Sequence, residues 1–251
     1  MLELKGVSKA FGGLRAVDDV SFSLTRGAIT GLIGPNGAGK TTLFNTIAGA
    51  LAPTSGEILF EGKAIEGKAP HQIYRSGIAR TFQIPRPFGA LSVLENVMLA
   101  PIGQSGEKFW NTLIRPGRIR QEENANRDKA VKILDFLKLT RLADEPARNL
   151  SGGQLKLLEL GRTLMSDPRL ILLDEPGAGV NPTLLGEIIE RIVDLNRRGI
   201  TFLIIEHNMD MVMNLCRPVV VMSGGRLLMQ GDPEDVRRDP RVLDAYLGGA
   251  A

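Results

Sequence analysis

The feature that most constrains this chain is the segment of residues 29–42, which reads Ile-Thr-Gly-Leu-Ile-Gly-Pro-Asn-Gly-Ala-Gly-Lys-Thr-Thr. A short apolar run ends at Gly34, which opens the spacing Gly-x-x-x-x-Gly-Lys-Thr. This spacing predicts a loop whose backbone N–H groups surround a phosphate at a helix N-terminus. Glycines permit the turn and let phosphate approach the backbone. The residues expected to bind nucleotide phosphates are Gly34, Pro35, Asn36, Gly37, Ala38, Gly39, Lys40, Thr41 and Thr42.

Two side chains of this loop have individual expected roles. Lys40 is expected to reach the β- and γ-phosphates, and the hydroxyl of Thr41 is expected to coordinate Mg²⁺. A Gly-rich turn without a ligand is the alternative. It is disfavoured because a strand, a loop and a helix follow one another in the order that the motif needs.

Composition limits the classes of protein that remain. The chain has 251 residues, of which 43% are hydrophobic, enough for one large domain or a core with a subdomain. Its formal charge of +3 is too small to argue for nucleic acid as a partner. The lone Cys216 excludes an intramolecular disulfide, which suits a reducing compartment. We expect a soluble protein that meets a membrane only through a partner, because no signal-peptide core and no apolar run near the ~20 residues of a bilayer span is found.

The hydrophobic pattern predicts strands that alternate with helices, and hence a parallel sheet covered by helices on both faces. Between residues 92 and 161 the pattern is mostly helical, with an irregular stretch at 101–120 and a capping box formed by Ser92 and Glu95. Asp232 and Asp239, each followed by Pro, are expected to cap two short final helices. Expected strands are 2–7, 17–24, 29–33, 57–60, 78–83, 170–173, 201–205 and 218–222, and other expected helices are 41–50, 70–76, 122–139 and 182–198.

A second group of chemical residues follows an apolar strand at residues 170–173. Asp174 and Glu175 would lie at the carboxyl edge of the sheet, where ligands bind in open α/β sheets. Asp174 is suited to Mg²⁺, and Glu175 is suited to polarise an attacking water. Alone this pattern is weak, because many strands end in a solvated acid. Downstream of a phosphate loop it favours a catalytic site.

A third motif, Leu-Ser-Gly-Gly-Gln at residues 150–154, precedes an apolar helical stripe. The simple interpretation is a helix capped by Ser151. Free N–H groups, a hydroxyl and the positive end of a helix also make a second anion site. A head-to-tail pair of chains would bring this site to the phosphate loop of the other chain. The nucleotide would then also be bound by Ser151, Gly152, Gly153 and Gln154.

Residues 34–42, 150–154 and 170–175, in this order, resemble the ATP-binding subunit of ABC transporters, and the resemblance covers essentially the whole chain. Leu-Ser-Gly-Gly-Gln is that family's signature, which phosphate-loop kinases and GTPases lack. The resemblance implies an α/β fold of the ABC-type P-loop NTPases, with a mostly parallel core sheet, an antiparallel β subdomain and a helical subdomain. It implies one domain, with the core in residues 1–87 and 162–251 and the helical subdomain in about 88–161.

The same resemblance implies ATP and Mg²⁺ as ligands and gives roles to further residues. Gln83 looks like the glutamine that contacts Mg²⁺ near the transmembrane partner, so the implied metal ligands are Thr41, Gln83 and Asp174. His207 looks like the histidine that contacts the γ-phosphate, and Phe11 matches the aromatic that stacks on adenine. The implied catalytic residues are then Lys40, Glu175 and His207. His71 is left as an ordinary surface or structural histidine.

One branch is favoured within the family. Most members have Asp where Asn181 stands, and an amide keeps the hydrogen bonding but loses the charge. The variant resembles the larger ATPase subunit of branched-chain amino-acid importers, as does the insertion at 101–120. The insertion contains Trp110 and several arginines. A packed flap with solvated arginines is favoured there over a basic, aromatic face at the membrane surface.

We therefore expect an ATP-hydrolysing subunit that powers an importer on the cytoplasmic face of a membrane. The implied partners are permease subunits, a second ATPase subunit of the same or a different chain and, indirectly, a periplasmic or extracellular substrate-binding protein. The alternatives are urea or amide import, lipid or lipopolysaccharide export and, in another class, a non-transport cassette in DNA repair or translation. No coiled coil, second cassette or concentrated basic patch supports the last, and nucleic acid is not expected.

Overall fold

The computed structural model describes residues 1–81, 85–105 and 116–247. The chain divides into two compact units. Unit 1 comprises Met1–Arg80, Arg169–Ala178 and Ile192–Ala251, and unit 2 comprises Thr81–Pro168 and Gly179–Arg191.

Unit 1 contains an antiparallel sheet of β1 (Leu2–Phe11), β2 (Leu14–Leu24), β4 (Ser55–Phe60) and β5 (Lys63–Ala64), in the order β2-β1-β4-β5. Apolar residues alternate with polar ones along β1 and β2, so each strand buries one face. Strand β1 is longer than the predicted strand at 2–7, because it runs through Phe11 and pairs that residue with Leu14. The short strand β5 was not predicted.

The second sheet of unit 1 has the order β10-β9-β3-β8-β7-β6. All its pairs are parallel except the edge pair β9–β10. Every residue of β3, β7 and β8 is buried, as expected for strands covered on both faces. The bounds are β3 (Ile29–Ile33), β6 (Ile78–Arg80), β7 (Leu170–Asp174), β8 (Thr201–Ile205), β9 (Val219–Ser223) and β10 (Arg226–Gly231).

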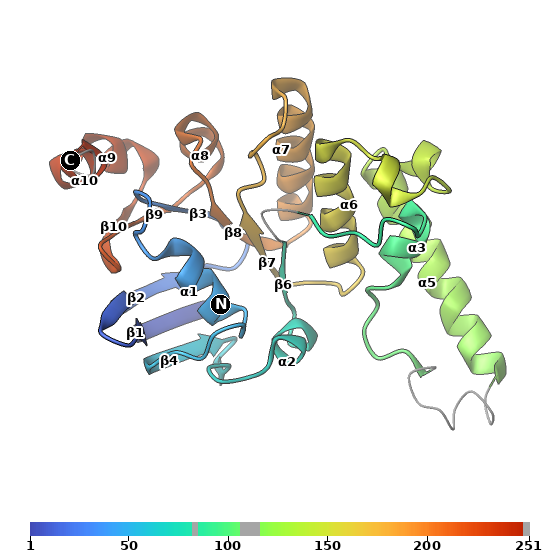
Figure 1. Cartoon of the computed structure of the whole chain (residues 1–251), viewed down its shortest axis with the longest axis horizontal. Helices are drawn as coiled ribbons and strands as arrows, with labels where there is room; N and C mark the ends of the chain where they lie inside the picture. Colours follow the sequence, from blue (N-terminus) through green and yellow to red (C-terminus); the bar gives the residue numbers. More distant parts are fainter. Residues whose placement is uncertain (82–84, 106–115, 248–251) are drawn as a thin grey trace. The chain divides into compact units, whose positions relative to one another are not determined.

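Helices α1 (Lys40–Ile47) and α8 (Met209–Leu215) cover opposite faces of this sheet (Figure 1). Leu32 of β3 belongs to the same buried cluster as Leu43 and Phe44 of α1. Its neighbour Gly31 faces Val212 of α8, because a Cβ there would lie 3.0 Å from that side chain. The cluster also includes β1, β2 and β4 residues, so α1 joins the two sheets in one core.

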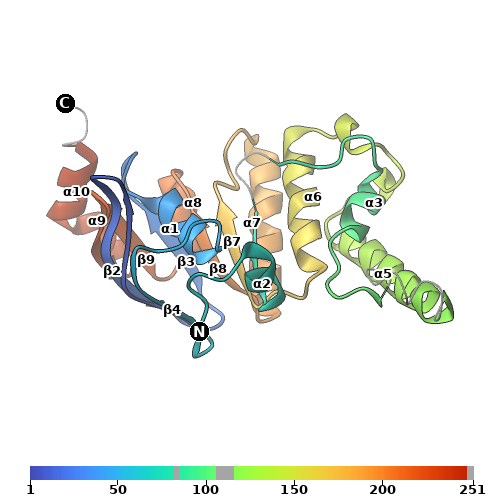
Figure 2. The same ribbon diagram turned by 60° about the horizontal axis from the view of Figure 1, so that its bottom comes forward.

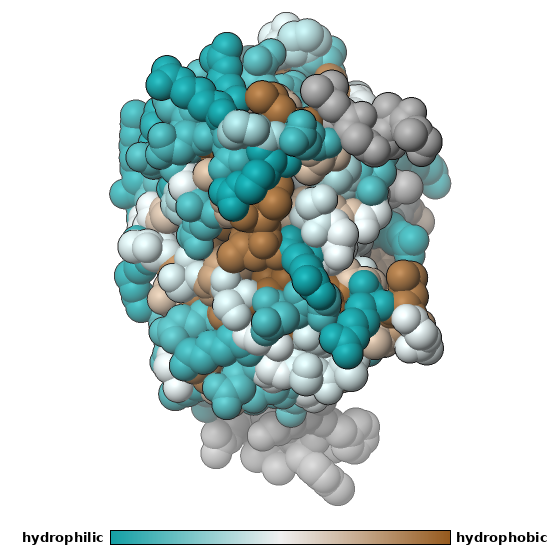
Figure 3. Space-filling view, turned by 90° about the vertical axis from the view of Figure 1, so that its left-hand side faces the viewer, coloured by the Kyte–Doolittle hydropathy of each residue, from teal (hydrophilic) through white to brown (hydrophobic). Residues whose placement is uncertain are grey.

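Unit 1 also holds α2 (Pro70–Arg75) and two final helices, α9 (Pro233–Arg238) and α10 (Pro240–Leu247). Asp239 caps α10 as predicted, since its Oδ1 accepts a hydrogen bond from the N–H of Arg241 at 2.8 Å. Asp232 stands at the N-cap of α9 with Pro233 after it, as predicted, but its side chain makes no capping hydrogen bond. The face of the molecule that carries α9 and α10 shows an apolar strip flanked by hydrophilic side chains (Figure 3).

Unit 2 is helical in its described residues. Helices α3 (Val93–Met98), α5 (Pro116–Phe136) and α6 (Gly152–Leu164) pack side by side (Figures 1 and 2). The capping box is confirmed: Ser92 Oγ accepts from the N–H of Glu95 at 3.1 Å, and Glu95 Oε2 accepts from the N–H of Ser92 at 2.7 Å. Helix α5 begins at Pro116, earlier than predicted, so the end of the stretch 101–120 is helical.

Two short 3-10 helices, η2 (Thr140–Leu142) and η3 (Ala147–Asn149), lie between α5 and α6 along the chain. Helix α7 (Pro182–Arg197) begins in unit 2 and ends in unit 1. Across the described residues, no helix combines the length and the apolar character needed to cross a bilayer.

Candidate functional site

The predicted phosphate loop connects β3 to α1 in unit 1, and its glycines are set by close backbone contacts. Gly39 has φ 93°, and a Cβ there would lie 2.2 Å from the carbonyl oxygen of Ala16. At Gly34, a Cβ would lie 2.1 Å from the carbonyl oxygen of Met222. Any larger residue would push the loop away from β2 and β9, so glycine is required at both positions.

Lys40 lies inside this loop with its ammonium group held by the backbone. Its Nζ donates to the carbonyl oxygens of Gly34 at 2.8 Å and Pro35 at 2.9 Å. Burial lowers the pKa of Lys40, and the negative charges of Glu175 and Asp174 oppose that shift. The ammonium is therefore fixed at the centre of the loop, near both predicted carboxylates.

The start of α1 has the features of an anion site. No side chain caps the helix, and no acidic residue lies in its first turn. Its first-turn N–H groups and its positive dipole end suit phosphate. Thr41 is exposed there.

The donor set fits a magnesium ion that is shared with phosphate. Among the described residues, no group of three His, Cys, Asp or Glu side chains could hold a metal ion. Mg²⁺ bound through one or two carboxylates takes further ligands from substrate phosphates and water. A hydroxyl from Thr41 and a carboxylate from Asp174 match that kind of site.

Asp174 ends β7 and is held by an arginine that was not predicted to matter. Its Oδ2 accepts from Nη2 of Arg80 at 3.0 Å, and both side chains are almost buried. Arg80 also donates from Nη1 to Oδ1 of Asn45 at 2.6 Å. Arg80 therefore links the carboxylate at the end of β7 to helix α1, which follows the phosphate loop.

Glu175 and His207 are in contact. Nε2 of His207 lies 3.1 Å from Oε1 of Glu175, and the His207 side chain is 44% exposed against 18% for Glu175. Glu175 has φ 49°, a left-handed conformation uncommon for a residue with a side chain. The N–H of Glu175 donates to the carbonyl of Ile205 at 2.9 Å, which ties it to β8. The structure thus brings a candidate base and a candidate phosphate ligand together.

In unit 2, the predicted second anion motif begins α6. Ser151 Oγ accepts from the N–H of Gln154 at 3.4 Å, and Gln154 Oε1 accepts from the N–H of Ser151 at 2.9 Å. Ser151 therefore lies at the exposed N-terminus of α6. That is the position required both for a helix cap and for the predicted anion site. Asn181 keeps the hydrogen bonding expected of an amide, since its Oδ1 accepts from the N–H of Leu184 at 2.9 Å at the start of α7.

Comparisons with known proteins give the family. A family model described as "ABC transporter" matches residues 17–178, and one described as "Branched-chain amino acid ATP-binding cassette transporter" matches residues 226–251. This chain belongs to the ATP-binding proteins of ABC transporters. Within that family it is of the branched-chain amino acid, or LivG, type.

The similarity of this ATP-binding cassette to its relatives extends over whole chains. It is 46% identical to LivG of Archaeoglobus fulgidus, over 99% of this chain and 95% of that protein. It is 39% identical to LivG of Escherichia coli, over 100% and 98%. Both carry names of branched-chain amino acid transport ATP-binding proteins.

Solved structures confirm the fold of the cassette. A nucleotide-free ATP-binding cassette from an ABC transporter superposes with a TM-score of 0.85 at 43% identity, covering 98% of each chain. The ADP conformation of another such cassette gives 0.83 at 41% identity, covering 99% of this chain and 98% of that one. The predicted core sheet, antiparallel sheet and helical part are therefore confirmed as the ABC ATPase fold, and the cassette is an ATPase of this family.

Two predicted features of the cassette lie outside the described residues. They are Gln83 and the half of the insertion, residues 106–115, that contains Trp110. Phe11 ends β1 with 47% of its surface exposed, and Nζ of Lys9 lies 5.2 Å from its ring centre. An aromatic side chain at the surface is available for stacking, which suits the predicted role.

Sequence reasoning missed some residues that contact the predicted site. Arg80 and Asn45 are two, and Tyr246 of α10 is another. Burial raises the pKa of the Tyr246 hydroxyl, and a hydrogen bond with the backbone of Gly34 opposes that shift. The tail segment 226–251, which matches the branched-chain model, thus reaches the first glycine of the phosphate loop.

Proposed function

We propose that this cassette hydrolyses ATP to drive import of branched-chain amino acids through a membrane permease. The contact between Glu175 and His207, in the unit that carries the phosphate loop, is the observation that carries the catalytic part. The names of the LivG relatives and the branched-chain match at residues 226–251 support the substrate class.

Different residues of unit 1 have separate roles in ATP binding and hydrolysis. The first turn of α1 and the ammonium of Lys40 bind the β- and γ-phosphates, and Phe11 stacks on adenine. Glu175 orients the attacking water and takes its proton, while His207 donates a hydrogen bond to the γ-phosphate. Positioning and electrostatics supply most of the catalysis of phosphoryl transfer.

Thr41, Asp174 and Gln83 would hold a magnesium ion. When bound, Mg²⁺ neutralises negative charge on the β- and γ-phosphates. Arg80 keeps the Asp174 carboxylate in place through the hydrogen bond described above.

The site is completed by a second cassette. Ser151, Gly152, Gly153 and Gln154 of one chain bind the γ-phosphate held by the phosphate loop of the other. ATP therefore favours the closed pair, and hydrolysis releases it. Permease subunits place the pair at the cytoplasmic face of the membrane, and a substrate-binding protein delivers the amino acid to the permease.

Purification of the tagged chain from detergent-solubilised membranes tests this assembly. We expect a permease and a second, different cassette to be recovered with it, and an amino-acid-binding protein to stimulate hydrolysis by the complex. Recovery with ribosomes or DNA and no membrane protein would contradict the proposal. Recovery of only one type of cassette would show a pair of identical chains.

A further inference from the structure

Glu206 is a buried carboxylate that the proposed mechanism does not use. It follows β8 directly, precedes His207 in the chain and is 3% exposed. Its two oxygens accept hydrogen bonds from three backbone N–H groups. Oε2 accepts from His207 at 2.9 Å and Asn208 at 3.1 Å, and Oε1 accepts from Gly177 at 2.6 Å.

These hydrogen bonds join two segments that are far apart in the sequence. Gly177 lies in the turn after Glu175, and the N–H of Ala178 in that turn donates to the carbonyl of Glu175 at 3.1 Å. His207 and Asn208 lead into α8. One oxygen of Glu206 therefore holds the Glu175 segment, and the other holds the His207 segment.

Because Glu206 is buried, separating the two segments that it joins would be energetically costly. A carboxylate removed from water is strongly destabilising unless its oxygens are hydrogen-bonded, and hydrogen bonds to a charged group are stronger than neutral ones. If the turn at Gly177 moved away from His207, Oε1 would lose its donor inside the protein. The relative positions of the two segments are thus fixed by a side chain that lies between their backbones.

We propose that Glu206 is a positioning residue that holds His207 and Glu175 in register for ATP hydrolysis. This inference rests on the proposed roles of those two residues. Glu206 acts through the backbone of both segments, and the 3.1 Å contact between Glu175 Oε1 and His207 Nε2 is the geometry that it maintains.

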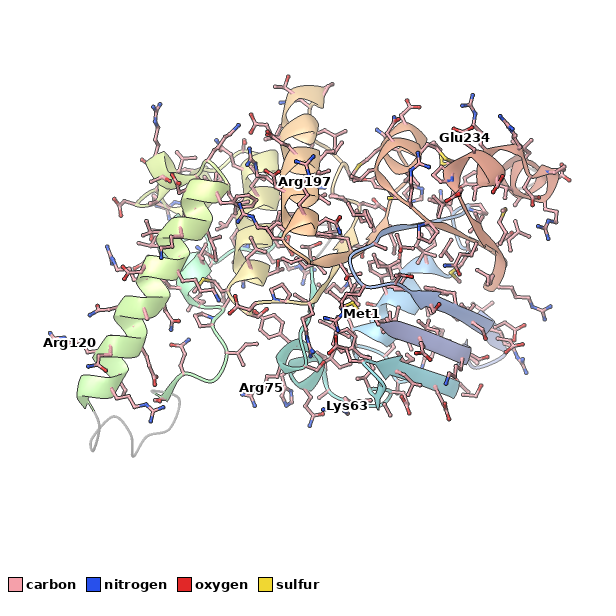
Figure 4. All side chains as sticks on the ribbon, turned by 180° about the vertical axis from the view of Figure 1, so that it is seen from behind. Met1, Lys63, Arg75, Arg120, Arg197 and Glu234 are labelled. Atoms are coloured by element: carbon pink, nitrogen blue, oxygen red, sulfur yellow. The ribbon has the colours of Figure 1, made fainter. Side chains whose placement is uncertain are left out.

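The first test is Glu206→Gln in the full-length chain. The new amide group presents N–H toward backbone donors on one side, so one segment loses its acceptor. We expect kcat to fall by about ten- to a hundred-fold, as for small misplacements of catalytic groups, with the KM for ATP changed less than about twofold. Glu234→Gln, at a glutamate on the surface of α9 (Figure 4), is the matched control and should leave both constants unchanged.

A double-mutant cycle with His207→Ala separates positioning from a general structural role. If Glu206 works through His207, Glu206→Gln should reduce kcat much less in the His207→Ala background than in the parent. Equal fold-losses in both backgrounds, or no loss in the parent, would overturn the proposal while leaving the role of His207 standing. If His207→Ala alone does not reduce kcat, the proposed role of His207 fails, and this inference fails with it.

A second variant keeps the proposal testable if Glu206→Gln fails to fold. If circular dichroism shows that Glu206→Gln does not fold, the same cycle is made with Glu206→Asp. Aspartate keeps the carboxylate, but its side chain is shorter by one methylene, so the carboxylate lies farther from its backbone donors. We expect a loss of kcat that is smaller than for Glu206→Gln and is again much reduced in the His207→Ala background. An equal fold-loss in both backgrounds would contradict the proposal.

Discussion

At the scale of single residues, Lys40 is the group on which we expect nucleotide binding to depend most. Its ammonium is buried and held by two carbonyl groups, and burial lowers its pKa against the opposing charges of Glu175 and Asp174. A phosphate ligand would add negative charge beside a desolvated cation. That interaction is stronger than the same pair in water.

Lys40→Met should therefore weaken ATP binding. Hydrogen bonds to charged groups contribute about 1.5–3 kcal/mol, so we expect a loss of affinity of about tenfold or more. Fluorescent-nucleotide titration measures it, and Lys63→Met on exposed β5 is the control. Unchanged affinity in Lys40→Met would contradict the assigned role.

Glu175 is the proposed base, so its substitution should separate ATP binding from ATP hydrolysis. Glu175→Gln keeps the shape of the side chain but removes the base, so we expect hydrolysis to fall by about a hundred-fold or more. ATP affinity should stay within about twofold, because the phosphate loop is untouched. Phosphate release measures turnover, and full activity in this variant would exclude Glu175 as the base.

At the scale of elements, the start of α6 packs closely against α7 within unit 2. A Cβ at Gly153 would lie 1.8 Å from Cδ2 of Leu184 and 2.7 Å from its Cγ, whereas a Cβ at Gly152 meets nothing within 4 Å. The two adjacent glycines of the signature therefore differ in their structural role.

Gly153→Ala should destabilise the nucleotide-free chain, and Gly152→Ala should not. Overpacking of this kind costs about 1–3 kcal/mol, while alanine at an open helical position is favoured over glycine. Urea unfolding of both variants gives the comparison. Equal free energies of unfolding for the two variants would show that α6 and α7 are not in this close contact.

Asp18 of β2 pairs with Arg15 of the same strand and with Arg226 of β10. Side-chain hydrogen bonds from Arg15 and then Arg226 lower the pKa of Asp18 below its ordinary value of 3.8. A carboxyl group with a lowered folded-state pKa stabilises the protein above its unfolded-state pKa, and this contribution is lost as the pH falls through the folded-state value.

Asp18→Asn should therefore lower the free energy of unfolding at pH 7, and its difference from the parent should shrink below about pH 4. Urea unfolding across this pH range tests the direction. Arg15→Gln should reduce the effect of Asp18→Asn at pH 7. A difference that does not change with pH would contradict the pairing.

At the scale of the whole molecule, long apolar runs made most of the fold predictable. Residues 29–33 and 201–205 are strands with the predicted bounds, because buried parallel strands are apolar on both faces. The edge strand β10 and the short strand β5 carry no such pattern and were missed.

The site was predictable where a motif fixes backbone geometry, as in the phosphate loop and at Ser151. Arg80, Glu206 and Tyr246 were missed for a physical reason. Each is a single polar side chain with at least one partner far away in the sequence, and only the folded chain brings the two together.

In the proposed function, ATP hydrolysis at this cassette powers amino-acid import. ATP-driven uptake of radiolabelled leucine into liposomes containing the purified transporter complex tests it most directly. We predict uptake that requires ATP and the substrate-binding protein, is competed by isoleucine and valine but not by urea, and is lost with Glu175→Gln. Leucine uptake that persists in Glu175→Gln, or uptake of urea in place of leucine, would contradict the account.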